Sequence, residues 1–226
     1  MKILLTGGAG YIGSHTAIAL VEAGFEPVVL DNFANSHPVV LERLAHITGQ
    51  AIALEHGDVL DTPWLTDVLR RHAPVGVVHF AGDKAVGESV AQPLKYFHHN
   101  IGGAVSLLQA MQAVAADAPN AAPTLVFSSS ATVSGDPASV PITEVFPRSH
   151  TNPYGHSKLV NEATRDSVRA RMVIQSIFYW VLAAVVFLIP RFSSVYSVEI
   201  LEHLLIQVVL EQLHQLVVIQ AMQIVH

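Results

Sequence analysis

The sequence predicts an α/β fold, a doubly wound parallel sheet with helices on both faces. Two patterns support this prediction. Short apolar runs of four to six residues alternate along the chain with longer segments of helical character. A glycine-rich loop joins the first apolar run to the first helical segment, and an acidic residue follows the second run. In parallel sheets of this kind, ligands bind at the carboxyl edge of the strands.

The first two expected strands flank one helix. Lys2–Thr6 is a short apolar run, and the loop after it leads into an expected helix over Ile12–Ala23, which Gly24 ends. Pro27–Leu30 is the second expected strand, and Asp31 follows it directly.

The alternation continues in the next third of the chain. Val39–Thr48 is an expected helix that Gly49 stops, and Ala51–Glu55 is the third expected strand. Thr62–His72 is an expected helix, because threonine followed by proline is typical of a helix N-terminus.

The remaining elements complete the expected sheet. Val75–Phe80 is the fourth strand, and Pro93–Ala116 reads as one long helix. Thr124–Ser128 is the fifth strand, and Pro153–Arg171 is a further helix.

The composition excludes several classes of protein. Of the 226 residues, 51% are apolar and 13% charged, the net charge is −6 and there is no cysteine. These values exclude a disordered chain, a disulfide scaffold and thiolate metal sites, and they predict no nucleic-acid partner. Met1 leads directly into a strand-like segment, so we expect no signal peptide and a cytoplasmic protein.

The composition also divides the chain at Arg171. We expect residues 1–171 to form one α/β domain and residues 172–226 to be an apolar, helical tail without glycine. Met172–Ile189 carries no charge and reaches the lower edge of a membrane-spanning length, while within Val198–Val225 polar residues recur every four positions from Glu199 to Gln215. The tail has two interpretations. It is a membrane anchor or oligomerisation helix, or, as we favour, sequence that replaced the end of a truncated gene.

The glycine loop is typical of a dinucleotide site. Gly7 permits a tight turn out of the strand, Gly10 lets the backbone approach a diphosphate, and Gly13 lets the helix lie close to the strand. The helix N-terminus then offers N–H groups to the anion. Asp31, 18 positions after Gly13, is placed to accept hydrogen bonds from ribose hydroxyls and to repel a 2′-phosphate, which favours NAD over NADP. The alternative is a glycine-rich turn and an ordinary turn aspartate.

The second motif pairs Tyr154 with Lys158 on one helix face, one turn apart. A nearby ammonium lowers the pKa of a phenol, so Tyr154 is a candidate to exchange a proton with a substrate hydroxyl. Ser130 and Thr132 follow the fifth strand, where their hydroxyls could bind the same substrate oxygen. The alternative is that Tyr154 and Lys158 are ordinary surface residues. The scattered histidines lack metal-ligand spacing, so we expect no metal, and the pair at 98–99 reads as a solvated helix face.

Seven segments together resemble the UDP-glucose 4-epimerases, which belong to the extended short-chain dehydrogenase/reductase group. They are residues 6–15, 30–32, 57–58, 79–82, 84–89, 128–133 and 153–158. The resemblance covers about residues 1–170, which correspond to the first half of a full-length epimerase. The family's sixth strand and its UDP-gripping domain are not recognisable after Arg171, so we expect the substrate domain to be missing.

The resemblance implies a tightly held NAD, a UDP-sugar substrate and the possibility of a homodimer. It implies a catalytic group of Tyr154, Lys158 and Ser130, with Ser130, Thr132 and Tyr154 at the substrate. The residues implied around the cofactor are Gly7, Gly10, Tyr11, Ile12, Gly13, Asp31, Asn32, Asn35, Ser36, Asp58, Val59, Phe80, Ala81, Gly82, Lys84, Asn100, Tyr154 and Lys158.

The implied reaction interconverts UDP-glucose and UDP-galactose through a 4-keto sugar. Tyr154 takes the proton of the 4-hydroxyl, the 4-hydrogen leaves as hydride to the nicotinamide, and the turned sugar takes it back on its other face. A nucleotide-sugar 4,6-dehydratase begins with the same oxidation but needs an acid where this chain has Ala131 and Thr132, so it ranks lower. The further alternatives are a non-catalytic NAD-binding fragment and a membrane-associated protein.

Overall fold

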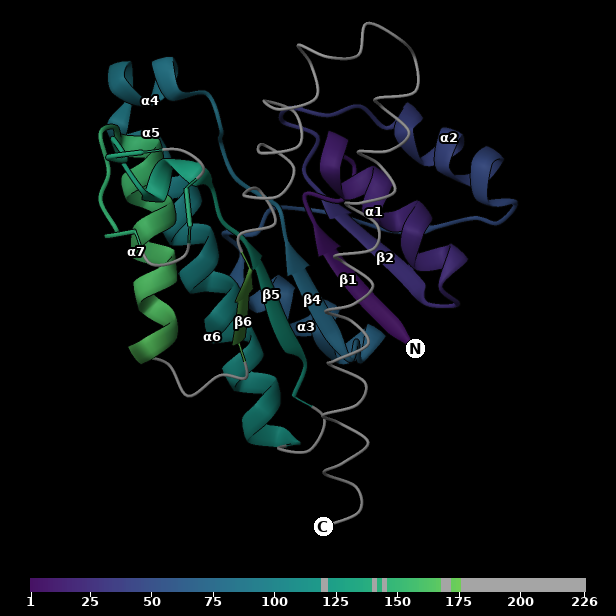
Figure 1. Cartoon of the computed structure of the whole chain (residues 1–226). Coiled ribbons are helices and arrows are strands. Elements are labelled where there is room, and N and C mark those ends of the chain that lie inside the picture. The colour runs from purple at the N-terminus through teal and green to yellow at the C-terminus, as the bar shows by residue number, and fades with distance from the viewer. Residues whose placement is uncertain (119–121, 140–141, 144–145, 168–171, 176–226) are drawn as a thin grey trace, which may run out of the picture.

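The computed structural model describes residues 1–118, 122–139, 142–143, 146–167 and 172–175 (Figure 1). Within these ranges the strands form one parallel sheet in the order β3-β2-β1-β4-β5-β6. The strands are β1 Lys2–Thr6, β2 Glu26–Asp31, β3 Ala53–His56, β4 Gly76–His79, β5 Thr124–Ser128 and β6 Met172–Gln175. The order reverses between β1 and β4, which is the switch point where sheets of this type bind ligands.

Helices cover both faces of the sheet (Figure 1). Helices α1 and α2 contact each other over one face, and α3 and α6 contact each other over the other face. The helices are α1 Tyr11–Glu22, α2 Val39–Thr48, α3 Thr62–His72, α4 Val86–Ala91, α5 Pro93–Tyr96, α6 Gly103–Asp117 and α7 Pro153–Ser167. A π-helical turn, η1, spans Phe97–Gly102, and a 3₁₀ turn, η3, spans Ala131–Val133.

Alternating side chains of each strand build two separate core layers. In β1, Ile3 and Leu5 pack beneath α1 and α2 with Leu20, whereas Leu4 packs beneath α3 and α6 with Leu107. These side chains are essentially inaccessible to solvent. Strands that are buried on both faces are typical of a parallel sheet with crossover helices, so the doubly wound fold is confirmed.

Most expected elements are confirmed, some with shifted bounds, and one difference lies where the structure departs from regular helix. The region expected as one helix over Pro93–Ala116 is divided into α5, η1 and α6, and α4 precedes it. The π turn has an i→i+5 hydrogen-bond pattern, which widens the helix. Apolar periodicity does not report such a turn, because it leaves the residues on either side helical.

The sixth strand corrects a second expectation. We expected the segment after Arg171 to start an apolar, helical tail and the family's sixth strand to be lost. Met172–Gln175 instead forms β6, which pairs in parallel with β5 from Leu125 to Ser128. An open edge of β5 offers backbone partners that an extended apolar run can satisfy. The interpretations of residues 176–226 lie outside the described residues, and no helix in the described ranges is long and apolar enough to cross a membrane.

Candidate active site

The first glycine of the loop lies against the end of the neighbouring strand. Gly7 has a φ of +69°, and a Cβ at this position would lie 2.7 Å from the backbone nitrogen of Ala81. A Cβ at Gly13 would overlap the carbonyl oxygen of Gly7. Gly10 precedes α1, and no side chain caps that helix N-terminus. The loop therefore packs tightly against the end of β4, and the positive end of α1 carries no side-chain cap, an arrangement compatible with the predicted diphosphate contact.

Asp31 braces the glycine loop from the end of β2. One carboxylate oxygen accepts a hydrogen bond from the Ala9 N–H at 3.0 Å. The other accepts from the Phe33 N–H at 2.9 Å and from the Ser36 hydroxyl at 2.8 Å. Asp31 is buried, so its carboxylate lies inside the group formed by the glycine loop and the turn after β2. We predicted only a ribose contact for Asp31, and the structure adds this bracing role. The role also involves Ser36, another of the predicted cofactor residues, whereas the neighbouring Asn35 is exposed.

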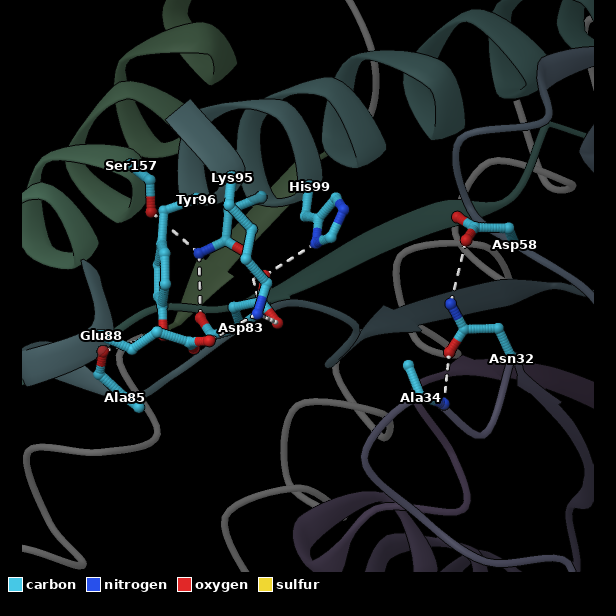
Figure 2. Close-up of polar contacts among 11 residues, drawn as sticks. Asn32, Ala34, Asp58, Asp83, Ala85, Glu88, Lys95, Tyr96, His99 and Ser157 are labelled. Atoms are coloured by element: carbon cyan, nitrogen blue, oxygen red, sulfur yellow. Dashed lines mark hydrogen bonds and ion pairs between the residues drawn. The ribbon is translucent and has the colours of Figure 1, made fainter. Parts of the chain in front are cut away.

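Asn32 and Asp58 join the loops that follow β2 and β3. The Asn32 amide donates to Asp58 at 2.9 Å, and its oxygen accepts from the Ala34 N–H at 3.0 Å (Figure 2). Val59 follows Asp58 and packs closely against Gly103 at the start of α6. A Cβ at Gly103 would lie 2.8 Å from the Val59 side chain. The structure thus brings these predicted adenosine-side residues together beside the loop that contains Asp31.

The Asn100 side chain is buried, and its polar atoms bind other residues of the chain. Its side-chain oxygen accepts from the Asp83 N–H at 2.8 Å, and its amide donates to the Asp83 carbonyl and to the Ser157 hydroxyl, both at 3.0 Å (Figure 2). Gly82 has a φ of +149°, and a Cβ there would lie 2.8 Å from the Asn100 oxygen. Asn100 therefore connects the segment after β4 to α7 by way of η1. Its predicted contact with NAD remains a prediction.

The segment after β4 is fixed by a group of charged side chains (Figure 2). His99 and Asp83 approach to 2.7 Å, as do Lys95 and Glu88. The Tyr96 hydroxyl donates to Glu88 at 2.9 Å, and burial raises the pKa of Tyr96 to about 12. His99 thus contacts a carboxylate, which the interpretation of a solvated helix face did not include. Of the predicted cofactor residues nearby, Phe80 is half-buried, whereas Lys84 is exposed.

Tyr154, Lys158 and Ser130 meet at the end of β5. The Ser130 side chain lies near the Tyr154 phenol, where it acts to lower the pKa of Tyr154. The Ser130 oxygen also accepts from the N–H and the hydroxyl of Thr132, at 3.3 and 2.9 Å. With its acceptor positions used in this way, the Ser130 hydroxyl is free to donate its proton to the phenol oxygen. The structure therefore brings the predicted catalytic group together with Thr132.

The electrostatics of this group differ from the prediction. Burial raises the pKa of Tyr154 above its ordinary value, and the neighbouring Ser130 side chain opposes this rise. Lys158 donates to the Ser128 carbonyl at 3.0 Å and lies 4.8 Å from the centre of the Phe127 ring. Its ammonium is therefore committed to partners other than the phenol, and burial lowers the pKa of Lys158 to about 8. The expectation that Lys158 lowers the pKa of Tyr154 is thus not met in this structure.

His79 is a buried site neighbour that the sequence reasoning did not single out. Its Nδ1 lies 2.6 Å from the Thr6 hydroxyl, which joins the ends of β1 and β4 at the switch point. Burial, together with the charge of Lys158, lowers the pKa of His79 to about 3, so the imidazole is neutral. A histidine at the end of an otherwise apolar strand could have indicated this buried, partnered role.

The family comparison agrees with this geometry. A family model described as GDP-mannose 4,6 dehydratase matches residues 4–180. The UDP-glucose 4-epimerase of Dictyostelium discoideum is 50% identical over 161 residues, which are 71% of this chain and 45% of that protein. The mouse UDP-glucose 4-epimerase is 47% identical over 177 residues, which are 75% of this chain and 49% of that protein. The chain thus spans about half the length of the curated relatives it matches.

Solved structures give the same relationship. A UDP-glucose 4-epimerase from Stenotrophomonas maltophila, with bound NAD and formylated UDP-arabinopyranose, has 40% identity and a TM-score of 0.71, over 77% of this chain and 52% of that one. The enzyme from Bifidobacterium longum, in complex with NAD⁺ and UDP, has 43% identity and a TM-score of 0.69, over 74% and 49%. The chain therefore belongs to the family that the GDP-mannose 4,6 dehydratase model describes, and within it is a homologue of the N-terminal half of the UDP-glucose 4-epimerases.

Proposed function

We propose that this chain binds NAD along the glycine loop and carries the catalytic group of a UDP-glucose 4-epimerase. The reaction is the interconversion of UDP-glucose and UDP-galactose by oxidation and re-reduction at sugar C4. The convergence of Tyr154, Ser130 and Lys158 at the end of β5, on the edge of the sheet that also carries the glycine loop, supports this proposal.

The loop geometry supports NAD as the cofactor. Gly7 and Gly13 leave no space for a Cβ, and α1 begins without a side-chain cap. Asp31 places a carboxylate at the end of β2, where it favours ribose hydroxyls over a 2′-phosphate. When bound, NAD supplies the hydride acceptor and donor for C4.

The side chains of this chain handle the proton. Tyr154 takes the proton of the sugar 4-hydroxyl and returns it after the sugar has turned. The Ser130 hydroxyl stabilises the phenolate by donating a hydrogen bond to its oxygen. Lys158 is held near the Tyr154 ring, at 5.9 Å from its centre, by the Ser128 carbonyl. Its charge favours the phenolate once a ligand brings the ammonium and the phenol into one hydrogen-bonded group.

One observation favours a second candidate function. Because the chain spans about half the length of the relatives that it matches, a non-catalytic NAD-binding protein is the alternative to an epimerase. A 4,6-dehydratase is disfavoured, because Ala131 and Thr132 occupy the positions after Ser130 where that reaction needs a carboxylate.

A chimaera separates the two candidates. Residues 1–175 are joined to the second half of the Bifidobacterium longum epimerase, and UDP-galactose conversion is followed in a coupled assay. Turnover that depends on Tyr154 supports the epimerase. A chimaera that folds and binds NAD without turnover supports the non-catalytic alternative. The same chimaera with Asp67→Ala, an exposed carboxylate on α3, controls for unspecific effects of substitution.

A further inference from the structure

Two tyrosine rings from different helices meet in the interior of the protein. The ring centroids of Tyr96 on α5 and Tyr154 on α7 lie 6.4 Å apart, and the ring planes cross at 83°. Aromatic pairs prefer such an edge-to-face arrangement at centroid distances of about 4.5–7 Å. Tyr96 is fully buried and Tyr154 is 9% exposed, so water has little access to the contact. The Tyr154 ring is therefore bounded on one side by a second aromatic ring.

The Tyr96 ring is anchored through its hydroxyl. This hydroxyl donates to the carbonyl oxygen of Ala85 at 2.8 Å and to the carboxylate of Glu88 at 2.9 Å (Figure 2). The other carboxylate oxygen of Glu88 accepts from Lys95 at 2.7 Å. A phenol has a single proton, which the two acceptors share. The segment that follows β4 therefore fixes the far end of the Tyr96 ring.

Other contacts fix the backbone of Tyr154. The Ser157 hydroxyl donates to the Tyr154 carbonyl at 2.7 Å. The next residue, Gly155, lies so close to η3 that a Cβ there would be 2.8 Å from the carbonyl oxygen of Thr132. Neither contact limits rotation about the Cα–Cβ bond of Tyr154, which moves the phenol between staggered positions. The ring of Tyr96 lies against the Tyr154 ring and does limit this rotation.

We propose that Tyr96 is a positioning residue for Tyr154: its ring, anchored by the segment after β4, holds the phenol in the orientation needed for proton exchange. Tyr96 acts through Tyr154 and itself exchanges no proton with the substrate. The inference rests on the proposed function for the proton exchange. The hold of one ring on the other is a property of this chain that can be measured without turnover.

The test reads the acidity of position 154 in the full 226-residue chain. A meta-fluorotyrosine replaces Tyr154 alone, and ¹⁹F NMR follows its titration. Burial raises the pKa of Tyr154, so a ring that turns toward water should titrate closer to the free amino acid. Tyr96→Leu removes the second ring and should close most of the difference in pKa between position 154 and free meta-fluorotyrosine. Tyr96→Phe loses the hydroxyl but keeps the ring, and it should retain the parent pKa.

Phe97→Leu is the matched control. Phe97 follows Tyr96 in the chain, and its ring lies edge-on to His156 of α7, with centroids 5.5 Å apart and planes at 87°. The control therefore also removes an aromatic ring that packs on α7, at a different residue of that helix. It should leave the titration of position 154 unchanged.

The comparison of Tyr96→Leu with Tyr96→Phe isolates the ring. The titratable groups around the phenol are Lys158 on α7 and Tyr96, with Glu88 of α4 behind Tyr96. Lys158 and Glu88 are present in every variant. Both substitutions of Tyr96 free Glu88 from the same hydroxyl, so a difference between them arises from the ring.

Three results would overturn the proposal. They are a Tyr96→Leu variant that titrates like the parent, a Tyr96→Phe variant that shifts as far as Tyr96→Leu, and a Phe97→Leu control with the same shift. If Tyr96→Leu does not fold, Tyr96→Met decides, because its flexible side chain fills more of the space without a ring. NAD binding is measured on the same samples by calorimetry. Its absence counts against the proposed function and not against this inference.

Discussion

The Lys158 ammonium donates a hydrogen bond to the carbonyl oxygen of Ser128 at 3.0 Å. This contact fixes the lysine to the last residue of β5, one residue before Ser129, which donates to Glu162 on α7. It also explains why the pKa of Tyr154 is raised: the phenol is buried, while the positive charge is bound elsewhere. The two side chains thus lie close together, but in this structure the ammonium binds the Ser128 carbonyl and not the phenol.

Lys158 should make the stability of the fold depend on pH. Its pKa is about 8 in the folded chain and about 10.4 in the unfolded chain, so the unfolded state binds more protons between these values. The contribution of Lys158 to folding therefore becomes more favourable as the pH rises from about 8 to 10. At pH 7, Lys158→Met should stabilise the chain by about 1–3 kcal/mol, since a charged amine is no longer buried. This gain should shrink at pH 9.5 in urea unfolding; a gain independent of pH would contradict the prediction.

Asp31 should determine the choice of cofactor. We expect tighter binding of NAD than of NADP, because the Asp31 carboxylate accepts ribose hydroxyls and repels a 2′-phosphate. Asp31→Ala should weaken NAD binding by about 1.5–3 kcal/mol for the lost ribose contact, with a further loss because the glycine loop is no longer braced, and it should reduce the preference. Calorimetry with both nucleotides measures this, with Asp67→Ala as the control carboxylate. Equal affinity of the parent chain for NAD and NADP would disprove it.

Gly7 should be intolerant of a side chain for two separable reasons. Gly7→Ala introduces both backbone strain and a collision with Ala81, whose nitrogen would lie 2.7 Å from the new Cβ. Gly49 has a φ of +71° and open space around it, so Gly49→Ala introduces the strain alone, about 1–2 kcal/mol. Gly7→Ala should therefore unfold at lower urea and lose NAD affinity, whereas Gly49→Ala keeps NAD affinity. Equal behaviour of the two variants would argue against the close contact.

Tyr154 should be the proton acceptor of the chimaera described above. Tyr154→Phe should lower its turnover by roughly 10²–10⁴-fold, the usual contribution of a general acid–base group. NAD binding should persist, because the phenol makes no contact with the glycine loop. Turnover near that of the parent chimaera would reject Tyr154 as the base.

The 226-residue chain alone should bind NAD but turn over UDP-galactose poorly. Binding at parts of the substrate remote from the reacting carbon supplies much of the positioning for catalysis, roughly 7–11 kcal/mol in favourable cases. The part of the relatives that this chain matches is about half of their length. The coupled assay on the purified chain checks this, and turnover within about tenfold of a full-length epimerase would refute it.

Local sequence patterns determined the fold class and most of its elements. Lys2–Thr6, Val39–Thr48, Thr62–His72 and Thr124–Ser128 have the predicted bounds, because apolar periodicity and helix-capping residues act over a few neighbouring positions. The spacing of Tyr154 and Lys158 likewise required only helix geometry.

Tertiary packing alone decided the contacts that give the site its properties. Asn100 with Ser157 and Ser129 with Glu162 join residues far apart in the chain, so no local pattern specifies them. The raised pKa of Tyr154 arises from burial, which depends on every element packed around it. Strand β6 forms because β5 offers backbone partners, a condition that its own four residues do not encode. The residue types of the site follow from the sequence, whereas their protonation and aim follow from the fold.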